Sequence, residues 1–279
     1  SWLVPVLPAA GQPGSAAQVD FDTLSITPVG STAVLGHVFA SERVPDGAGG
    51  WRDHPLAGVT ITVDGAEETL RTTTDAGGFF RLQPVPAGRF FVHVDGRTAS
   101  ESDWPNGAYY PVVGKAWEAA AGVTTNLANG SGVIYLPQVP ADALQPVSAT
   151  TETVIPFPAS VVARQPEFAG VEVRVPPNAL FSNSGQRGGR VGLSPVASDR
   201  LPEPLPPGIE HILDITVQSD GAENFDQPVP VRFPNLPNPR TGERVPPGEQ
   251  TALVSFNHDL GRWEVVGSMT ATADGQFLD

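Results

Sequence analysis

The sequence lacks cysteine entirely, contains a single lysine, Lys115, and has no long apolar run. Without cysteine the chain can form neither a disulfide nor a zinc site built on cysteine pairs, and cysteine usage gives no information on the redox compartment. A membrane-spanning helix needs about 18 consecutive apolar residues, and no stretch approaches that length. We therefore expect no thiol chemistry and no membrane insertion.

Basic residues are also scarce. The chain of 279 residues carries 16 Lys and Arg against 30 Asp and Glu, which gives a net charge of −14. Such an acidic surface repels phosphate backbones, so nucleic acid is not an expected partner. The chain opens on Ser1 and Trp2 without an initiator Met or a basic segment, and we interpret it as a processed or excised piece.

Glycine and proline are abundant, with 30 of each, and apolar residues make up 40% of the chain. Glycine and proline spread without a period favour many short strands joined by tight turns. The apolar content is enough for proper cores, and a chain of this length typically forms two domains of about 100–150 residues. Length and composition therefore predict two domains of short strands with Pro- and Gly-rich connections. Strands at a spacing of about 8–12 residues predict that the protein is all-β, with two β-sandwich domains in tandem.

The clearest local pattern lies at residues 249–275. Ala252, Val254 and Phe256 alternate with Thr251, Leu253 and Ser255 in the period of two that a strand imposes. The alternation resumes at Arg262–Gly267. The five residues between them, Asn257–Gly261, favour a turn, and the last of them is a glycine that can adopt a positive φ. We predict a β-hairpin with a polar tip, followed by a separate strand at Met269–Ala273.

Strand and turn signals divide the chain into four parts. Residues 1–30 are expected to form a linker or one added strand, 31–96 a compact β-domain, 97–149 a connector, and 150–279 a second β-domain. In the first domain, strands are expected at Ala33–Phe39, Val59–Val63, Thr69–Thr74, Phe79–Leu82 and Arg89–Val94.

The connector and the second domain carry weaker signals. In the connector, two stretches have strand-like patterns, Tyr109–Val113 and Val133–Leu136, and Lys115–Ala121 has a composition compatible with one or two helical turns. In the second domain, strands beside the hairpin are expected at Thr153–Phe157, Gly170–Val175, Arg190–Val196, His211–Gln218 and Val229–Phe233. Proline-rich turns separate these strands, because proline cannot donate to a ladder and is confined to edges and corners.

Three short motifs occur in order within residues 31–96: a Pro-Leu-x-Gly-Val step at Pro55–Val59, a Thr-Asp-x-x-Gly-x-Phe turn at Thr74–Phe80, and a Pro-x-Gly step at Pro86–Gly88. Together they resemble the carboxypeptidase regulatory-like domain, a small prealbumin-like, Ig-like sandwich. The resemblance implies this fold but little about function, because the family occurs as a non-catalytic spacer or adhesion module in unrelated proteins. A related collagen-adhesin domain carries a Lys–Asn isopeptide bond, which we do not expect here because the first strand has no lysine.

A second resemblance covers the rest of the chain. The step at Val175–Leu180 is similar to one in the sandwich domain shared by ankyrins and netrin receptors. The runs at Tyr135–Pro137, Pro204–Gly208, Asn224–Asn235 and Ser255–Gly275 resemble the region upstream of the repeats in large secreted RHS/YD-repeat proteins related to teneurins. In that family this region follows a carboxypeptidase regulatory-like domain, and its last strand continues further. The resemblance implies a secreted or surface-displayed bacterial protein, with the second domain truncated at its C-terminus.

No catalytic constellation stands out. The five histidines, at 37, 54, 93, 211 and 258, show no metal-ligand spacing. His37 and His93 are expected at the edge of the core, and His258 in a solvated turn. No Gly-x-Ser-x-Gly elbow occurs, and Ser255–His258 lacks the His-Phe-Ser step at which some domains of the ankyrin and netrin-receptor type cut themselves. We therefore predict that the chain is not an enzyme and uses no cofactor.

Several acidic loops suggest a metal site as an alternative to a chain without any cofactor. The carboxylates of Asp46, Asp64, Asp75 and Asp220 could offer oxygen ligands to a structural calcium ion. None of these loops has the spaced D-x-D-x-D-G pattern, so ordinary turns are the simpler interpretation.

Aromatic residues near predicted loops suggest the remaining candidate site. Trp51, Trp104, Tyr109 and Tyr110 could stack on a sugar or on a protein partner. The alternative is that they close the ends of the sandwich.

These observations favour a structural role. We interpret the chain as a non-catalytic spacer, cap or docking module of a large secreted or cell-surface protein, whose expected partners are other domains of the same polypeptide. An adhesion module that binds a glycan or a protein through its loop aromatics is the alternative. A hydrolase or self-processing domain is the least favoured interpretation.

Overall fold

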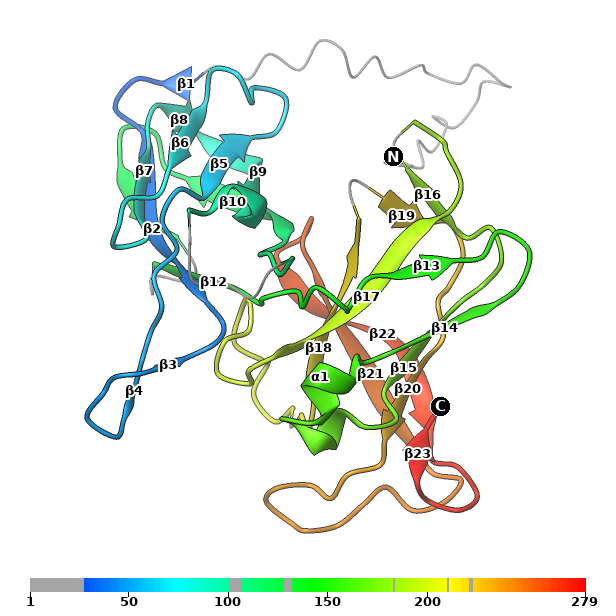
Figure 1. The fold of residues 1–279 in the computed structure, drawn as a ribbon. Coiled ribbons are helices and arrows are strands. Elements are labelled where there is room, and N and C mark those ends of the chain that lie inside the picture. Colours follow the sequence, from blue (N-terminus) through cyan, green and yellow to red (C-terminus); the bar gives the residue numbers. More distant parts are fainter. Residues whose placement is uncertain (1–27, 101–106, 128–131, 183, 210, 221–222) are drawn as a thin grey trace, which may run out of the picture.

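The computed structural model describes residues 28–100, 107–127, 132–182, 184–209, 211–220 and 223–279, and over these residues the chain is all-β, as predicted. The helical segments described are short: η2 (Gly96–Thr98), α1 (Ala159–Val162) and η3 (Pro166–Phe168). None of the described helices has the length and apolarity that a bilayer crossing demands. The architecture therefore depends on how the strands pair (Figure 1).

The first core lies between two sheets. One has the order β10-β9-β5-β6, and in the other β2 pairs with β7 along one edge and with both β11 and β12, in parallel, along the opposite edge. The strands are β2 (Ala33–Ala40), β5 (Thr60–Val63), β6 (Arg71–Thr73), β7 (Phe79–Leu82), β9 (Gly88–Asp95), β10 (Val112–Ala119), β11 (Thr124–Asn126) and β12 (Val133–Leu136). Two short ribbons lie beside them: β1 (Pro28–Val29) with β8 (Val85–Pro86), and β3 (Val44–Pro45) with β4 (Trp51–Arg52).

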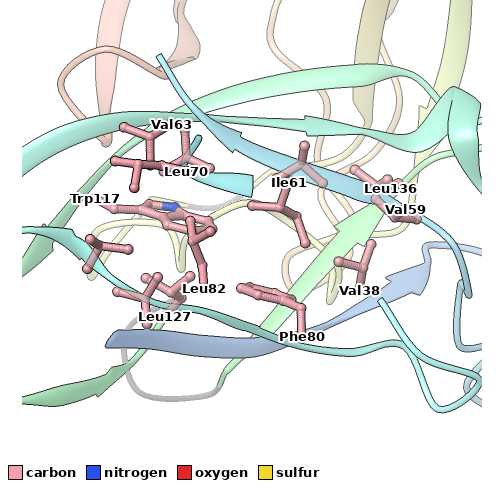
Figure 2. Packing of buried hydrophobic residues seen from close by; sticks show 14 of the residues in the cluster. Val38, Val59, Ile61, Val63, Leu70, Phe80, Leu82, Trp117, Leu127 and Leu136 are labelled. Atoms are coloured by element: carbon pink, nitrogen blue, oxygen red, sulfur yellow. The ribbon is translucent and has the colours of Figure 1, made fainter. Parts of the chain in front are cut away.

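The alternation read from the sequence decides which side chains fill this core. Val34 and Val38 of β2, and Val59, Ile61 and Val63 in and before β5, are fully buried, as the period of two predicts. Phe80 and Trp117 stack with their ring centroids 6.0 Å apart. Figure 2 shows these side chains meeting between the two sheets. The apolar area that they remove from water is the main stabilising term of this half of the chain.

The helical turns considered at Lys115–Ala121 are absent, and this expectation was wrong. The segment forms most of β10, which pairs with β9 from Val112 opposite Asp95 to Ala119 opposite Gly88. An isolated helix of one or two turns is only marginally stable in water. In the strand, the side chains of Trp117 and Ala119 are buried on one face while the backbone gains a full ladder. Tertiary burial therefore overrides the helix propensity of alanine and glutamate.

Residues 97–149, predicted to be a connector, contribute β10, β11 and β12, and all three pair with strands from residues 31–96. The two parallel strands lie end to end along the same edge of β2, because β11 pairs with Ala33–Leu35 and β12 with His37–Ala40. The first core thus includes chain well beyond residue 96.

Two further buried clusters gather strands from the C-terminal part of the chain, a larger one and a small one formed by Met269, Ala271 and Leu278. Their sheets have the orders β13-β17-β18, β14-β15-β20-β23, β16-β19 and β21-β22. The strands are β13 (Gln145–Val147), β14 (Thr153–Pro156), β15 (Glu172–Val175), β16 (Leu180–Ser182), β17 (Gly189–Val196), β18 (Asp214–Ser219), β19 (Glu223–Phe225), β20 (Val231–Pro234), β21 (Gln250–Asn257), β22 (Arg262–Thr270) and β23 (Phe277–Leu278). Ile155, Val173, Leu180 and Leu193 are among the fully buried side chains of the larger cluster, which is the second core.

The predicted hairpin is confirmed as β21 and β22, but its second arm differs from expectation. β22 runs unbroken from Arg262 to Thr270, where a separate strand at Met269–Ala273 was predicted. Opposite Leu253 and Val254 the register shifts from Gly267 to Val265, so Val266 is an extra residue in a β-bulge. The bulge lets the strand continue past Gly267 while its side chains change face.

The turn between Asp75 and Phe79 shows why the sequence needs glycine at one position. The Asp75 carboxylate accepts hydrogen bonds from the N–H groups of Gly77 and Phe79, each at 2.9 Å. Gly78 has φ of 73°, and a Cβ there would lie 2.5 Å from the carbonyl oxygen of Val38. Both the backbone conformation and the close approach therefore require glycine.

We expect Gly78→Ala to lower the free energy of unfolding by about 3 kcal/mol or more, since it combines an unfavourable positive φ with a clash against backbone. Gly47→Ala is the matched control, because Gly47 has φ of 80° but open space around its Cβ position. The control should lose only about 1–2 kcal/mol. Urea unfolding of the two variants measures the difference, and equal losses would show that the contact with Val38 carries no cost.

Candidate functional site: the junction between the two cores

The tip of the β21–β22 hairpin docks on the outer edge of β10. The backbone N–H of Ala116 donates to the carbonyl of His258 at 2.9 Å, and the guanidinium of Arg89 donates to the carbonyl of Asp259 at 2.5 Å. β10 is the last strand of its sheet, so its outer backbone groups would otherwise face solvent. The tip was expected to be solvated, and His258, Asp259 and Leu260 are exposed; its contacts with β10 and Arg89 are made by backbone carbonyls.

Lys115 ties this contact to a third segment. Its ammonium group pairs with the carboxylate of Glu203, donates to the carbonyl of Pro202 at 3.3 Å, and lies 5.4 Å from the ring centroid of Phe256. The indole N–H of Trp263 donates to the carbonyl of Glu203 at 3.0 Å. The side chains of Lys115 and Glu203 are only 17% and 11% exposed, so water weakens their attraction less than it would on an open surface.

His258 remains exposed, but the docked contact removes part of the water around its ring. Loss of solvent lowers the pKa of His258 below its ordinary value, the nearby charge of Lys115 lowers it further, and a backbone hydrogen bond with Gly114 opposes the shift. The ring meets Phe256 edge-on at 5.0 Å. The lowered pKa favours the neutral form of this imidazole.

Arg200 provides a second connection between the two cores. Its side chain is 3% exposed, and its guanidinium lies 4.3 Å from the ring centroid of Tyr135 on β12. It donates to the carboxylate of Asp53 at 2.5 Å and to the carbonyl of Ala40 at 3.5 Å. A buried arginine with an acid partner, a carbonyl and an aromatic face satisfies its charge without water.

The aromatic residues predicted to contact a ligand do not share one surface. Trp51 is 66% exposed on β4, in the ribbon that projects away from the first core (Figure 1). Tyr110 is buried, and its hydroxyl donates to the carboxylate of Glu42 at 3.3 Å. Tyr109 is half-buried and pairs through its backbone with Val139, and burial raises the pKa of its hydroxyl. Trp104 lies outside the described residues.

Two open hollows flank the segment around Ser198 and Asp199. One, of ≈ 500 Å³, is lined by Tyr135, Leu201, Glu203 and His211 among others, and one of ≈ 480 Å³ includes Phe168 and Asp214. Within the described residues, neither hollow is lined by Trp51, Tyr109 or Tyr110. The hollows are therefore features of the junction, not of the predicted aromatic site.

One His–carboxylate pair lies at these hollows. The Nδ1 atom of His211 is 2.6 Å from the Oδ2 atom of Asp214, and both side chains are largely buried. Desolvation raises the pKa of Asp214, and the neighbouring imidazole opposes that rise. Sequence reasoning placed both residues on one strand, whereas β18 begins at Asp214 and leaves His211 in the preceding turn.

The acidic loops considered for calcium use their carboxylates in turns. Asp46 accepts from the N–H groups of Ala48 and Gly50 at 2.8 Å, and these bonds lower its pKa. The carboxylate of Asp220 lies 3.6 Å from the guanidinium of Arg190. Asp64 differs, because His93 on β9 approaches it.

Sequence reasoning missed the residues that make the junction. Lys115 is the one lysine in a chain whose other 15 basic residues are arginine. This uniqueness was the feature of the sequence that could have pointed to a special role for Lys115. Arg200, Glu203 and Asp53 lie in loops of ordinary composition, where nothing local distinguishes a buried ion pair from a solvated charge.

Comparisons with known proteins do not assign a family. No family model matches the chain, and neither the curated proteins nor the solved structures yield a match. The resemblances noted in the sequence therefore remain predictions.

We expect Arg200→Ala to lower the free energy of unfolding by about 2–3 kcal/mol, because it removes a buried cation together with its stacking on Tyr135. Arg43→Ala is the matched control: Arg43 pairs with the neighbouring Asp199, but the two side chains are 48% and 55% exposed. The control should change stability by about 0.5 kcal/mol or less. Chemical denaturation compares the two, and a similar small effect of both would contradict the anchoring role of Arg200.

The raised pKa of Asp214 predicts a pH dependence. Between its ordinary value of 3.8 and its higher folded value, the folded state binds more protons than the unfolded state, so this group lowers the free energy of unfolding as pH rises through that interval. Asp214→Asn should flatten this fall.

Asp274→Asn is the control of opposite sign. Hydrogen bonds from Thr272 and Gln276 lower the pKa of Asp274, so this carboxylate adds stability above its unfolded pKa and loses it on acidification. Unfolding measured from pH 3 to pH 7 distinguishes the two variants, and parallel pH curves for wild type and Asp214→Asn would rule out the assignment.

Proposed function

We propose that this chain is a non-catalytic structural and interaction segment, a spacer, cap or docking module, of a large secreted or cell-surface modular bacterial protein. In this proposal its two cores belong to two Ig-like or prealbumin-like β-sandwiches in tandem. The observation that carries the proposal is the junction: the hairpin tip, Lys115 and Arg200 join the two cores at separate places.

Several contacts at separate places restrict bending more than one flexible connection does. A connection through a linker alone leaves two cores free to tilt, which is the usual expectation for domains in one chain. Here a backbone hydrogen bond to β10, the largely buried pair Lys115–Glu203 and the pair of buried Arg200 with half-exposed Asp53 act together. A segment built in this way can hold the domains on either side of it in a fixed relative orientation.

The charge of the chain fits the proposed partners. A net charge of −14 disfavours nucleic acid and favours solubility at high local concentration, as a surface-displayed module requires. The other domains of the same polypeptide are the proposed partners.

An adhesion module is the second candidate, and one observation favours it. Trp51 is 66% exposed on the projecting β3–β4 ribbon, and an exposed tryptophan is a favourable anchor for a sugar ring or a protein partner. A hydrolase or self-processing domain is less well supported. Among the described residues, no hydroxyl nucleophile is hydrogen-bonded to the His211–Asp214 pair.

The chain has no cysteine, so two introduced cysteines can be labelled specifically to test the spacer proposal. Arg71→Cys on β6 and Val154→Cys on β14 place two spin labels on exposed strand positions, one on each core. Pulsed electron paramagnetic resonance should give a single narrow distance distribution. Adding Lys115→Ala and Arg200→Ala should broaden it, since both side-chain connections are then lost, whereas adding Arg43→Ala should not.

A broad distribution in the otherwise unchanged chain would overturn the rigid-spacer proposal. The adhesion candidate is tested separately by screening glycans against the unlabelled chain. Binding that Trp51→Ala abolishes without changing thermal stability would replace the spacer proposal with the adhesion module.

A further inference from the structure

Three ligand-type side chains converge beside β9 at the point where β5 ends. They are Asp64, Glu67 and His93, and one potential ligand atom from each lies within 4.8 Å of the other two. The Nε2 atom of His93 is 3.0 Å from the Oδ1 atom of Asp64. The sequence separates these residues by up to 29 positions, so only the pairing of β5 with β9 brings them together.

The cluster is held by the sheet and not by a free loop. His93 lies on β9 between Thr62 of β5 and Gly114 of β10, and its ring meets Phe91 edge-on at 5.3 Å. The N–H of Asp64 donates to the carbonyl of Phe91 at 3.0 Å, which continues the ladder past the end of β5.

Glu67 is oriented in the adjoining turn. One of its carboxylate oxygens, Oε1, accepts from the N–H of Gly65 at 2.9 Å. The turn is closed by the N–H of Ala66, which donates to the carbonyl of Val63 at 3.0 Å. The sheet and the turn thus position all three residues before any ligand arrives.

A simple His–Asp ion pair does not explain this arrangement. It leaves the carboxylates of Asp64 and Glu67 within 4.8 Å of each other, a separation at which like charges repel. A divalent cation between the three groups would turn that repulsion into attraction. The other close His–carboxylate pair, His211 with Asp214, has no third ligand group beside it in the described chain.

The donor set indicates which cations fit. One imidazole nitrogen and two carboxylate oxygens suit Zn²⁺ and related divalent transition metals, whereas Ca²⁺ takes oxygen ligands alone. Tetrahedral bonds of about 2.0–2.1 Å place neighbouring ligand atoms roughly 3.3 Å apart. The 3.0 Å between His93 and Asp64 is close to that spacing, and Glu67 needs only a small movement to join them.

We propose that Asp64, Glu67 and His93 form a surface site for one divalent transition-metal cation of the Zn²⁺ class. Three protein ligands leave a fourth coordination position for water or for a donor group of another molecule. The site does not depend on the proposed spacer function.

Isothermal titration of the full chain with Zn²⁺ at pH 7 tests the proposal. We expect one ion per chain, with Ca²⁺ binding at least tenfold more weakly. His93→Ala and Glu67→Gln should each weaken Zn²⁺ binding at least tenfold. Glu68→Gln is the matched control, because it removes the same charge from the next residue of the same turn and should leave the affinity within about twofold.

Two outcomes would overturn the site. Equal weakening by Glu67→Gln and Glu68→Gln would indicate diffuse attraction to an acidic surface, and unchanged binding by His93→Ala would show that another group holds the ion. Circular dichroism checks the fold of each variant. If His93→Ala does not fold, Asp64→Asn replaces it in the titration. A second measurement then follows the NMR resonances of the His93 ring in the unchanged chain. The site requires that these resonances shift on addition of Zn²⁺.

Discussion

The outer edge of β10 is the constraint on which the arrangement of this chain depends. An edge strand presents unpaired N–H and C=O groups, and a protein must cover them or leave them open to other strands. Here the tip of a hairpin from the far end of the chain covers the edge, through the bond from Ala116 to His258. That hairpin also shares the small cluster of Met269, Ala271 and Leu278, which adjoins the second core through Val231 and Phe233. Covering the edge therefore helps to fix the position of the two cores at the same time.

The charged residues at this contact differ in how much water they keep. The pair of Arg43 with Asp199 is half exposed, so its contribution to stability is small. Arg200 is almost fully buried, and it is tolerated only because Asp53, the Ala40 carbonyl and the Tyr135 ring together replace its water shell. The exposure of Lys115, at 17%, lies between those of Arg200 and Arg43. A chain that is acidic overall thus places scarce cations where two segments must be held together.

Local patterns predicted much of the fold, and the errors share one cause. The alternation at Val59, Ile61 and Val63 and the turn at Asp75–Phe79 depend on neighbours in sequence, and both form as expected. The helical turns considered at Lys115–Ala121 failed because pairing with β9 and burial of Trp117 outweigh local propensity. Trp51 and Tyr110 looked equivalent in the sequence, yet one is exposed and the other buried, since exposure depends on what packs from elsewhere.

The sequence by itself determined the strand class, the hairpin and the absence of thiol chemistry, because each follows from residue type and short-range periodicity. Only the tertiary structure decided that the hairpin tip meets β10, that Lys115 finds Glu203, and that His93 joins Asp64 and Glu67. These contacts join residues that are far apart in the chain. Their free energy comes from desolvation and charge pairing between separate strands. Local sequence patterns therefore do not predict these contacts.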